Sequence, residues 1–147
     1  PVYTAVIAAL VEGGANVNFT DERGTSVLAK AARRGTTAAV RTLISAGAVD
    51  IDRALDTAIT YGMIRYCAPL LRAGAAIPWR VYEGTFRPDP QTLAYIRRIR
   101  ATWGGFKAYE KAHRQHLAAI FLAKFPVLPV EMLERIVDFS WDIGGHE

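Results

Sequence analysis

The amino-acid sequence predicts an all-α fold, in which a solenoid of helical repeats is followed by a C-terminal helical extension. One observation is a repeated segment, a leucine followed by a Gly-Ala pair, that begins at Leu10, Leu43 and Leu70. The other is a spacing of three and four between apolar residues further along the chain, in residues 88–103 and 106–125. A recurring segment is typical of stacked repeats, and the second spacing is that of an amphipathic helix.

Composition limits the class of protein. The chain has 147 residues, of which 51% are hydrophobic and 22% charged, which is typical of one globular domain. It contains no uninterrupted apolar run of the roughly 18 residues that span a membrane. Its first residues lack an initiator Met, a basic leader and a small-residue cleavage site, so we expect a piece of a longer protein and no signal peptide. The single cysteine, Cys67, excludes an internal disulfide and favours a cytoplasmic or nuclear location.

The best-defined repeat lies between residues 21 and 50. Gly14 and Gly47 are 33 residues apart, and Gly47 and Gly74 are 27 apart. Gly24 suits a tight turn, Ser26 can cap a following helix, and Gly35 suits the end of that helix. The small residues Ala31 and Ala32 allow paired helices to approach closely, and Leu43 and Ile44 are expected to pack a second helix onto the neighbouring repeat.

The run DERGTSVLAKAARRG from Asp21, followed by TTAAVRTLISAGAVD, resembles the ankyrin repeat. The resemblance covers residues 1–78, about two and a half repeats, and implies helix pairs with projecting β-hairpin fingers and a role in binding other proteins. The chain has Ser26-Val27-Leu28-Ala29 where the family usually has Thr-Pro-Leu-His, which implies lower stability for each repeat. The next repeat is six residues shorter before its first helix and is expected to have almost no finger. Before Asp21, only the second helix of a repeat is expected.

In ankyrin proteins, partners bind the finger tips and the exposed edge of the first helices. Carried onto this chain, the partner-binding residues are Phe19, Glu22, Arg23, Thr25, Arg33 and Arg34.

Residues 79–90 are expected to form an ordered connecting loop, with Trp79, Tyr82 and Phe86 packed against neighbours. A helix is then expected to begin near Pro90 and to end at Gly104-Gly105. Its apolar face would hold Leu93, Ile96, Ile99 and Trp103, with Arg97, Arg98 and Arg100 off that face.

Residues 91–147 form the predicted extension. The helix in residues 106–125 has a wide apolar side made of Tyr109, Ala112, His116, Leu117, Ile120, Phe121 and Leu122. A last helix is expected directly after Leu128-Pro129.

The segment LPVEMLERIVDF from Leu128 resembles the opening of an F-box, and a truncated F-box after ankyrin repeats resembles the PRANC module of poxvirus proteins. The resemblance implies docking on the adaptor subunit of a cullin-type ubiquitin ligase. The docking residues would be Leu128, Pro129, Glu131, Met132, Leu133 and Ile136. A SOCS box is a weaker match, because residues 116–125 lack the cysteine that binds elongin. A helix that only caps the repeats would show the same apolar face, so both interpretations stay open.

Three functional hypotheses follow. The first is a protein–protein interaction module that links a target to a ubiquitin ligase, and the second is a plain scaffold with a C-terminal cap. The third is binding of nucleic acid or an acidic partner by the arginines Arg33, Arg34, Arg41, Arg97, Arg98 and Arg100, although a solvated helix face also explains such residues. No enzymatic activity, metal or other cofactor is expected, since Glu110, His113 and His116 lack a third zinc ligand and the spacing of a zinc site.

Overall fold

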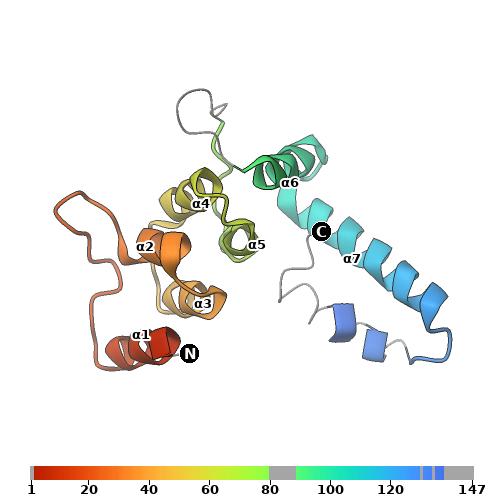
Figure 1. The fold of residues 1–147 in the computed structure, drawn as a ribbon, viewed down its shortest axis with the longest axis horizontal. Helices are drawn as coiled ribbons and strands as arrows, with labels where there is room; N and C mark the ends of the chain where they lie inside the picture. The colour runs from red at the N-terminus through yellow and green to blue at the C-terminus, as the bar shows by residue number, and fades with distance from the viewer. Residues whose placement is uncertain (1, 80–88, 130, 134, 138–147) are drawn as a thin grey trace. The chain divides into compact units, whose positions relative to one another are not determined.

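The computed structural model describes residues 2–79, 89–129, 131–133 and 135–137 (Figure 1). Within these ranges the protein is helical, with one isolated antiparallel bridge between Thr20 and Ser26. The helices are α1 (Val2–Glu12), α2 (Val27–Arg34), α3 (Thr37–Ser45), α4 (Ile51–Thr60), α5 (Ile64–Arg72), α6 (Pro90–Ala101) and α7 (Gly105–Lys124). The all-α prediction is therefore confirmed. The chain divides into two compact units, Pro1–Arg97 and Arg98–Glu147.

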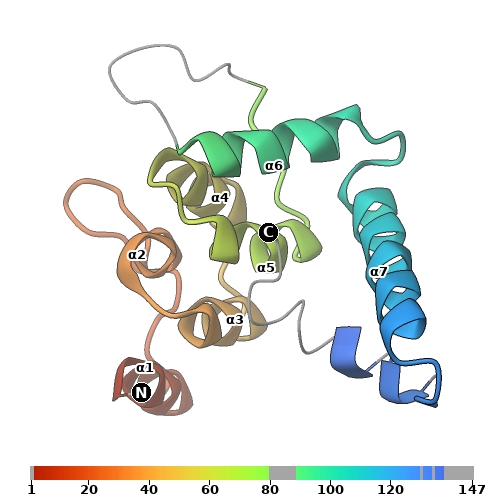
Figure 2. The same cartoon turned by 45° about the vertical axis from the view of Figure 1, so that its right-hand side comes forward.

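Helices α1 to α5 of the first unit form two layers. Helix α2 packs against α4 in one layer, and α3 packs against both α1 and α5 in the other. The pairs α2–α3 and α4–α5 join the layers, as Figure 2 shows. The core between them consists of buried small and branched apolar side chains, among them Leu28, Ala32, Val40, Leu43, Leu55, Ala58, Ile59 and Leu70. Small residues such as Ala32 and Ala58 let the helices approach closely, because they add little volume at the contact.

Helix α2 begins and ends where the sequence predicts. The Ser26 hydroxyl accepts a hydrogen bond from the backbone N–H of Ala29 at 3.1 Å, so the predicted N-cap is confirmed. The helix ends at Gly35, but not through a left-handed residue, because Gly35 has φ −80°. A Cβ at Gly35 would lie 2.6 Å from the carbonyl oxygen of Ala31, so a glycine is needed for close backbone approach. The Tyr66 hydroxyl of α5 donates a hydrogen bond to the Gly35 carbonyl.

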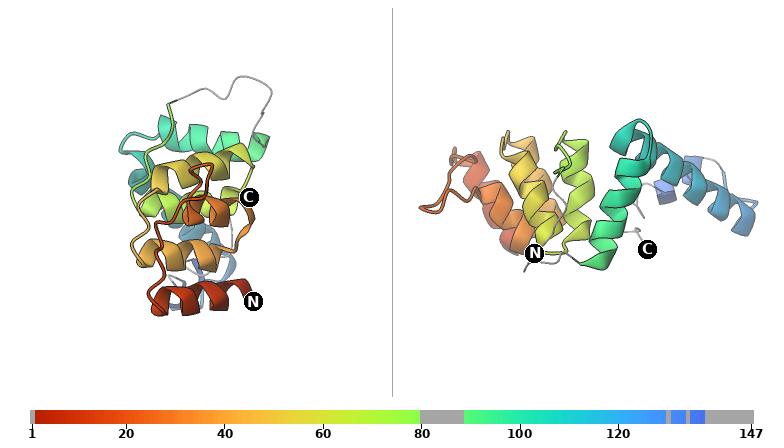
Figure 3. Two further views of the ribbon diagram at one scale, coloured as in Figure 1. Left: turned by 90° about the vertical axis from the view of Figure 1, so that its left-hand side faces the viewer. Right: turned by 90° about the horizontal axis from the view of Figure 1, so that it is seen from above.

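Residues 13–26, which we call the finger, connect α1 to α2. At its tip the Gly24 N–H donates to the Asp21 carbonyl at 2.8 Å, and Gly24 has the predicted positive φ, 68°. At its base the Asn18 side chain donates to the Gly47 carbonyl and accepts from the Val49 N–H. Residues 46–50 alone connect α3 to α4, so no comparable projection precedes α4. Figure 3 shows the finger extending from the red and orange end of the ribbon.

The buried face of helix α6 agrees with the predicted one at Ile96 and Ile99 and in part at Leu93, which is partly buried, but not at Trp103. Asp89 caps its start by accepting the Thr92 N–H at 3.0 Å, and the most buried side chains are Thr92, Tyr95, Ile96 and Ile99. Ile96 and Ile99 were predicted to be buried, whereas Trp103 is 98% exposed. The helix ends at Ala101, so the three- and four-residue spacing does not extend to Trp103. In the preceding loop Trp79 is also exposed, and Tyr82 and Phe86 lie outside the described residues.

The second unit contains α7 and the segment after it. Gly104, with φ 95°, separates α6 from α7, as the Gly-Gly pair predicts. The predicted apolar side of α7 is covered only in part. Its partly buried members are Tyr109, Leu117 and Phe121, whereas Ala112, His116, Ile120 and Leu122 are exposed. The predicted apolar side of α7 is wider than the surface that covers it, so the residues at its edges are exposed to solvent.

After Pro129 the described residues 131–133 and 135–137 are helical, as predicted. Leu133 is 1% exposed and Val137 is 4% exposed. The rest of the predicted terminal helix, from residue 138 on and including Trp141, lies outside the described residues. Within the described ranges, none of the helices has both the length and the apolar character needed to cross a membrane.

A cationic groove as the candidate functional site

A groove of about 440 Å³ lies on the first unit, bounded by the finger, α2 and α4. Its lining is dominated by basic side chains. The residues that line it are Asp21, Arg23, Thr25, Ala29, Lys30, Arg33, Arg34, Arg53, Thr57 and Tyr61. Five cations face one carboxylate, an excess as large as the net charge of the whole chain, +4. We call this feature the cationic groove.

Asp21 fixes the shape of the finger beside the groove. Its carboxylate accepts the backbone N–H groups of Arg23 at 3.0 Å and Thr25 at 2.8 Å. It also pairs with the Lys30 ammonium of α2 at 2.9 Å. The hydrogen bond from Lys30, together with the backbone N–H bonds, lowers the pKa of Asp21 from 3.8 to about 2. At neutral pH the carboxylate of Asp21 is therefore charged, and it is already bound to groups of the protein itself.

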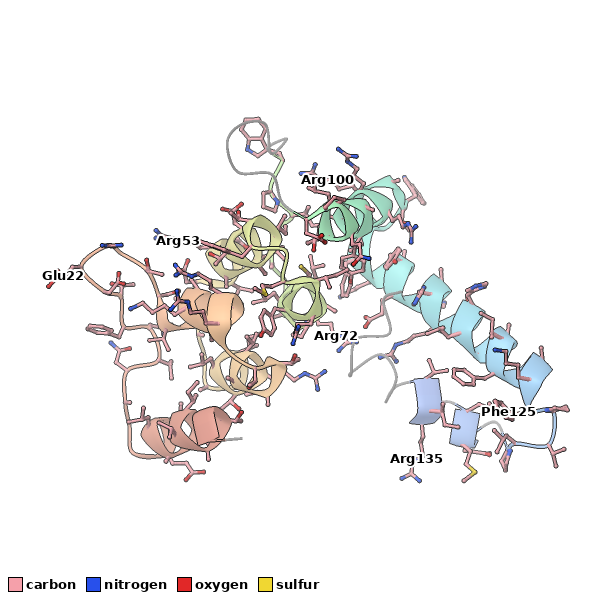
Figure 4. All side chains as sticks on the ribbon, viewed as in Figure 1. Glu22, Arg53, Arg72, Arg100, Phe125 and Arg135 are labelled. Carbon is pink, nitrogen blue, oxygen red and sulfur yellow. The ribbon has the colours of Figure 1, made fainter. Side chains whose placement is uncertain are left out.

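Two arginines are held in place by contacts within the groove. Arg53 of α4 donates from Nη1 to the Gly24 carbonyl at the finger tip, at 2.7 Å. Figure 4 shows Arg53 extending from α4 toward the finger. The Arg33 guanidinium of α2 lies over the ring of Tyr61, 5.0 Å from the ring centroid. A guanidinium stacked on a ring keeps its in-plane N–H donors available for hydrogen bonds.

Arg23 and Arg34 are the groove arginines whose guanidinium groups are most available to a ligand. Both side chains are exposed, and among the described residues neither guanidinium has an ion pair with a carboxylate. An arginine presents five N–H donors in a planar fork that matches the two oxygens of a carboxylate. The cationic groove can therefore bind anionic groups without first breaking an internal ion pair at these two positions.

A second depression of about 350 Å³ adjoins the cationic groove at the finger tip. It is lined by Phe19, Asp21, Glu22 and Arg23, and it shares Asp21 and Arg23 with the groove. Phe19 is 59% exposed and presents an aromatic ring to solvent at this depression. The site thus combines an apolar contact point with a cluster of cations.

All six residues predicted to bind a partner line one of these two depressions. Arg23, Thr25, Arg33 and Arg34 line the cationic groove, and Phe19 and Glu22 line the second depression. Sequence analysis did not assign the other residues that line the groove to partner binding. They are Asp21 of the finger, Ala29 and Lys30 of α2, Arg53 and Thr57 of α4, and Tyr61, which directly follows α4. Arg53, Thr57 and Tyr61 are spaced by four, so residues at these positions face the same side of a helix. This spacing is the signal in the sequence that could have grouped them.

The other arginines of the nucleic-acid hypothesis do not line the groove. Arg41 belongs to α3, in the other layer of the first unit. Arg97, Arg98 and Arg100 lie on α6 and are exposed, and the boundary between the two units falls after Arg97.

The predicted adaptor-docking residues differ in their exposure. Pro129, Glu131 and Met132 are exposed, with Met132 at 54%, while Leu128 and Ile136 are partly buried. Leu133 is 1% exposed, so in this arrangement its side chain is out of reach of an adaptor. Phe125 and Val127, which precede this segment in the sequence, are also exposed apolar residues, at 50% and 92%.

Cys67 of α5 and the histidines His113 and His116 of α7 do not line the cationic groove or the adjoining depression. Cys67 is completely buried, and burial raises its pKa to about 12, so the reactive thiolate is suppressed. His113 stacks on Tyr109 with 5.9 Å between ring centroids, and His116 is exposed. The described residues include no group of three or more His, Cys, Asp or Glu that could hold a metal ion.

Comparison of the chain with family models, curated proteins and solved structures finds no match.

Proposed function

We propose that residues 1–78 are ankyrin-type repeats and that the protein is a protein–protein interaction module that binds a partner at the finger and the cationic groove. The two helical layers support the repeat assignment, since α2–α3 and α4–α5 are successive helix pairs that stack side by side, with one helix of each pair in each layer. The hairpin-like finger before α2, closed by the Thr20–Ser26 bridge, also supports it. The interaction role is carried by one observation, that every residue expected to bind a partner lines one of two adjoining depressions.

The chemistry of the site supports binding over catalysis. A binding site needs exposed donors and an apolar contact, and here these are Arg23, Arg34 and Phe19. Arginine and aromatic residues are enriched among the residues that contribute most to protein interfaces. The proposed module works inside the cell, in the cytoplasm or the nucleus, where the free thiol of Cys67 is stable.

Site-specific photo-crosslinking tests this proposal. Phe19 is replaced by the photoreactive amino acid p-benzoylphenylalanine, which has a similar aromatic ring, and the chain is irradiated in the cells that express it. We expect a discrete protein adduct at Phe19 that disappears when Arg33→Glu and Arg34→Glu are added. The matched control places the same photoreactive residue at Leu10 of α1, which is equally exposed at 56% but does not line either depression. Binding at this site would be contradicted if no adduct formed at Phe19. It would also be contradicted if the adduct still formed after Arg33→Glu and Arg34→Glu were added.

A second candidate function is recruitment of a cullin-ligase adaptor by the segment after α7, which would make the protein a substrate receptor. The observation that favours it is that three apolar residues close together in the sequence, Phe125, Val127 and Met132, are each at least half exposed. A helix that only caps the repeats is the alternative, and it needs no such exposed residues.

Met132→Asp and Leu133→Asp separate these two alternatives. The chain is mixed with the purified adaptor subunit and analysed by size-exclusion chromatography. If the segment docks, Met132→Asp abolishes co-elution while the thermal midpoint is unchanged, because the side chain is 54% exposed. Leu133→Asp is expected to lower the midpoint in either case, because it buries an unpaired carboxylate. If the unmodified chain does not co-elute with the adaptor subunit, the docking proposal is wrong and the capping role is the one that remains.

A further inference from the structure

We propose that the partner segment bound by the cationic groove is an acidic stretch of another protein, with carboxylates at Arg23, Arg33 and Arg34 and an apolar side chain at Phe19. This inference rests on the proposed function and specifies its partner. The first argument is charge, since five cations and one carboxylate line the groove and the carboxylate of Asp21 is already paired with Lys30. A neutral or basic segment would leave these cations uncompensated or would be repelled by them.

The internal contacts of the groove distinguish the roles of its cations. Lys30 is paired with Asp21, and Arg53 is hydrogen-bonded to the Gly24 carbonyl, so both chiefly hold the finger in place. Arg33 is held over Tyr61 in a fixed orientation. The guanidinium groups of Arg23, Arg33 and Arg34 therefore remain to receive a ligand. Guanidinium groups bind carboxylates in a bidentate geometry that a lysine cannot reproduce.

The surroundings of the groove favour a peptide over a nucleic acid. Single-stranded nucleic acid binds by stacking successive bases on aromatic faces. The aromatic residues of the site are Tyr61, one face of which is already covered by Arg33, and Phe19. Glu22 lies in the adjoining depression, where it would repel a continuous phosphate backbone. A peptide can place its carboxylates in the groove and an apolar residue against Phe19, with a neutral or basic residue near Glu22.

The volume of the site also suits a short segment. The groove and the adjoining depression measure about 440 and 350 Å³ and share two lining residues. Each lies within the roughly 300–1,000 Å³ of sites that enclose a small ligand. A few consecutive residues of a partner would occupy them, which is consistent with recognition of a linear acidic motif.

Selection from random displayed peptides on the full 147-residue chain tests the inference. We expect the enriched peptides to share aspartate or glutamate residues beside an apolar residue. A synthetic copy of the most enriched peptide should bind about tenfold more weakly to Arg34→Glu, because a reversed charge faces its carboxylates. Its affinity should also fall as salt is raised, since exposed charges are screened beyond about 8 Å at physiological ionic strength. Oligothymidylate is the nucleic-acid probe in the same assay.

Lys111→Glu is the matched control, because it makes the same reversal of charge at an exposed residue of α7 outside the groove. The affinity of the synthetic peptide for Lys111→Glu should stay within about twofold of its affinity for the unmodified chain. Circular dichroism of both variants checks that the helices persist, as expected for exposed positions.

The remaining outcomes separate the inference from the proposed function. Peptides that depend on Arg34 but show no acidic preference would overturn the acidic partner and leave the protein-binding role. Failure to enrich any peptide that depends on Arg34 would overturn both. Binding of oligothymidylate that Arg34→Glu removes, with no acidic peptide selected, would identify a nucleic-acid site instead.

Discussion

At the scale of single residues, Asp21 connects the finger to α2. It receives two backbone N–H groups of the finger and the Lys30 ammonium of α2. These contacts stabilise its charged form, which is why its pKa falls to about 2. A carboxyl group with a lower pKa in the folded than in the unfolded protein stabilises the fold above the unfolded pKa.

We predict that Asp21→Asn removes a pH-dependent part of the stability. The amide keeps an oxygen that can accept the backbone N–H groups, so the variant isolates the charge. The unmodified chain should be more stable than Asp21→Asn near neutral pH, and the difference should vanish as the pH falls from about 4 to about 2. Urea unfolding at a series of pH values measures it. When Lys30→Met is added to both chains, the stability difference between them should disappear at a higher pH, because the pKa of Asp21 rises. A stability difference that persists unchanged to pH 2 would contradict the assigned pKa.

At the scale of elements, the start of α2 depends on a single cap. The Ser26 side chain is 2% exposed and satisfies the N–H of Ala29, while its backbone pairs with Thr20 to close the finger. The helix is only 8 residues long, so loss of one cap affects a large part of it. The same residue therefore determines both where the helix begins and how the finger ends.

We predict that Ser26→Ala lowers the free energy of unfolding by about 1 kcal/mol. The reason is that the buried Ala29 N–H loses its hydrogen-bond acceptor. Urea unfolding followed by circular dichroism measures the change. The control is Ser45→Ala, where an exposed hydroxyl donates only to the Arg41 carbonyl of its own helix, and its effect should be within about 0.5 kcal/mol. Equal changes in the free energy of unfolding for Ser26→Ala and Ser45→Ala would show that the cap does not stabilise the protein.

The helices were largely predictable because their determinants are local. Ser26 as a cap, Pro90 at the start of α6 and the Gly104-Gly105 break each depend on neighbouring residues in the sequence. The exposure of Trp103 was not predictable from spacing, since it depends on the residue at which α6 ends. Likewise, Ile120 and Leu122 match the apolar pattern of α7 but lie outside its covered strip.

The groove was only half predictable for a different reason. The finger and α2 residues follow from the ankyrin resemblance, which assigns partner contacts to those positions. Arg53 and Tyr61 join them only because α4 packs against α2, and they lie about thirty residues further along the chain. The spacing of four between Arg53, Thr57 and Tyr61 indicates that they share a face, but not that this face lies against α2.

At the scale of the whole molecule, the chain consists of two compact units, and the candidate groove belongs entirely to the first. The second unit contains the apolar segment around Met132. If the proposals are right, target binding and adaptor binding are assigned to different units of one chain. The two functions could then be altered independently by substitution.

We predict that Leu133→Ala destabilises the second unit and leaves the first unchanged. Truncating a leucine that is 1% exposed should cost about 2–5 kcal/mol in that unit. Hydrogen exchange measured by mass spectrometry should show faster exchange in peptides from 105–137 and unaltered protection in α2 and α4. Met132→Ala, at an exposed neighbouring position, is the control and should change neither. Faster exchange throughout α2 and α4 would mean that the units unfold together.

The hydrogen bond from Arg53 to the Gly24 carbonyl has a consequence for the kinetics of binding. The finger tip is anchored by α4, and its base is anchored by the contacts of Asn18 with Gly47 and Val49. The chain therefore loses the conformational entropy of the finger on folding, before any partner arrives, and a preorganised site binds with a smaller entropic penalty. Association should then be limited by diffusion and electrostatic steering, without a slow ordering step. Differences in affinity among the proposed acidic partners should accordingly be found mainly in their dissociation rates.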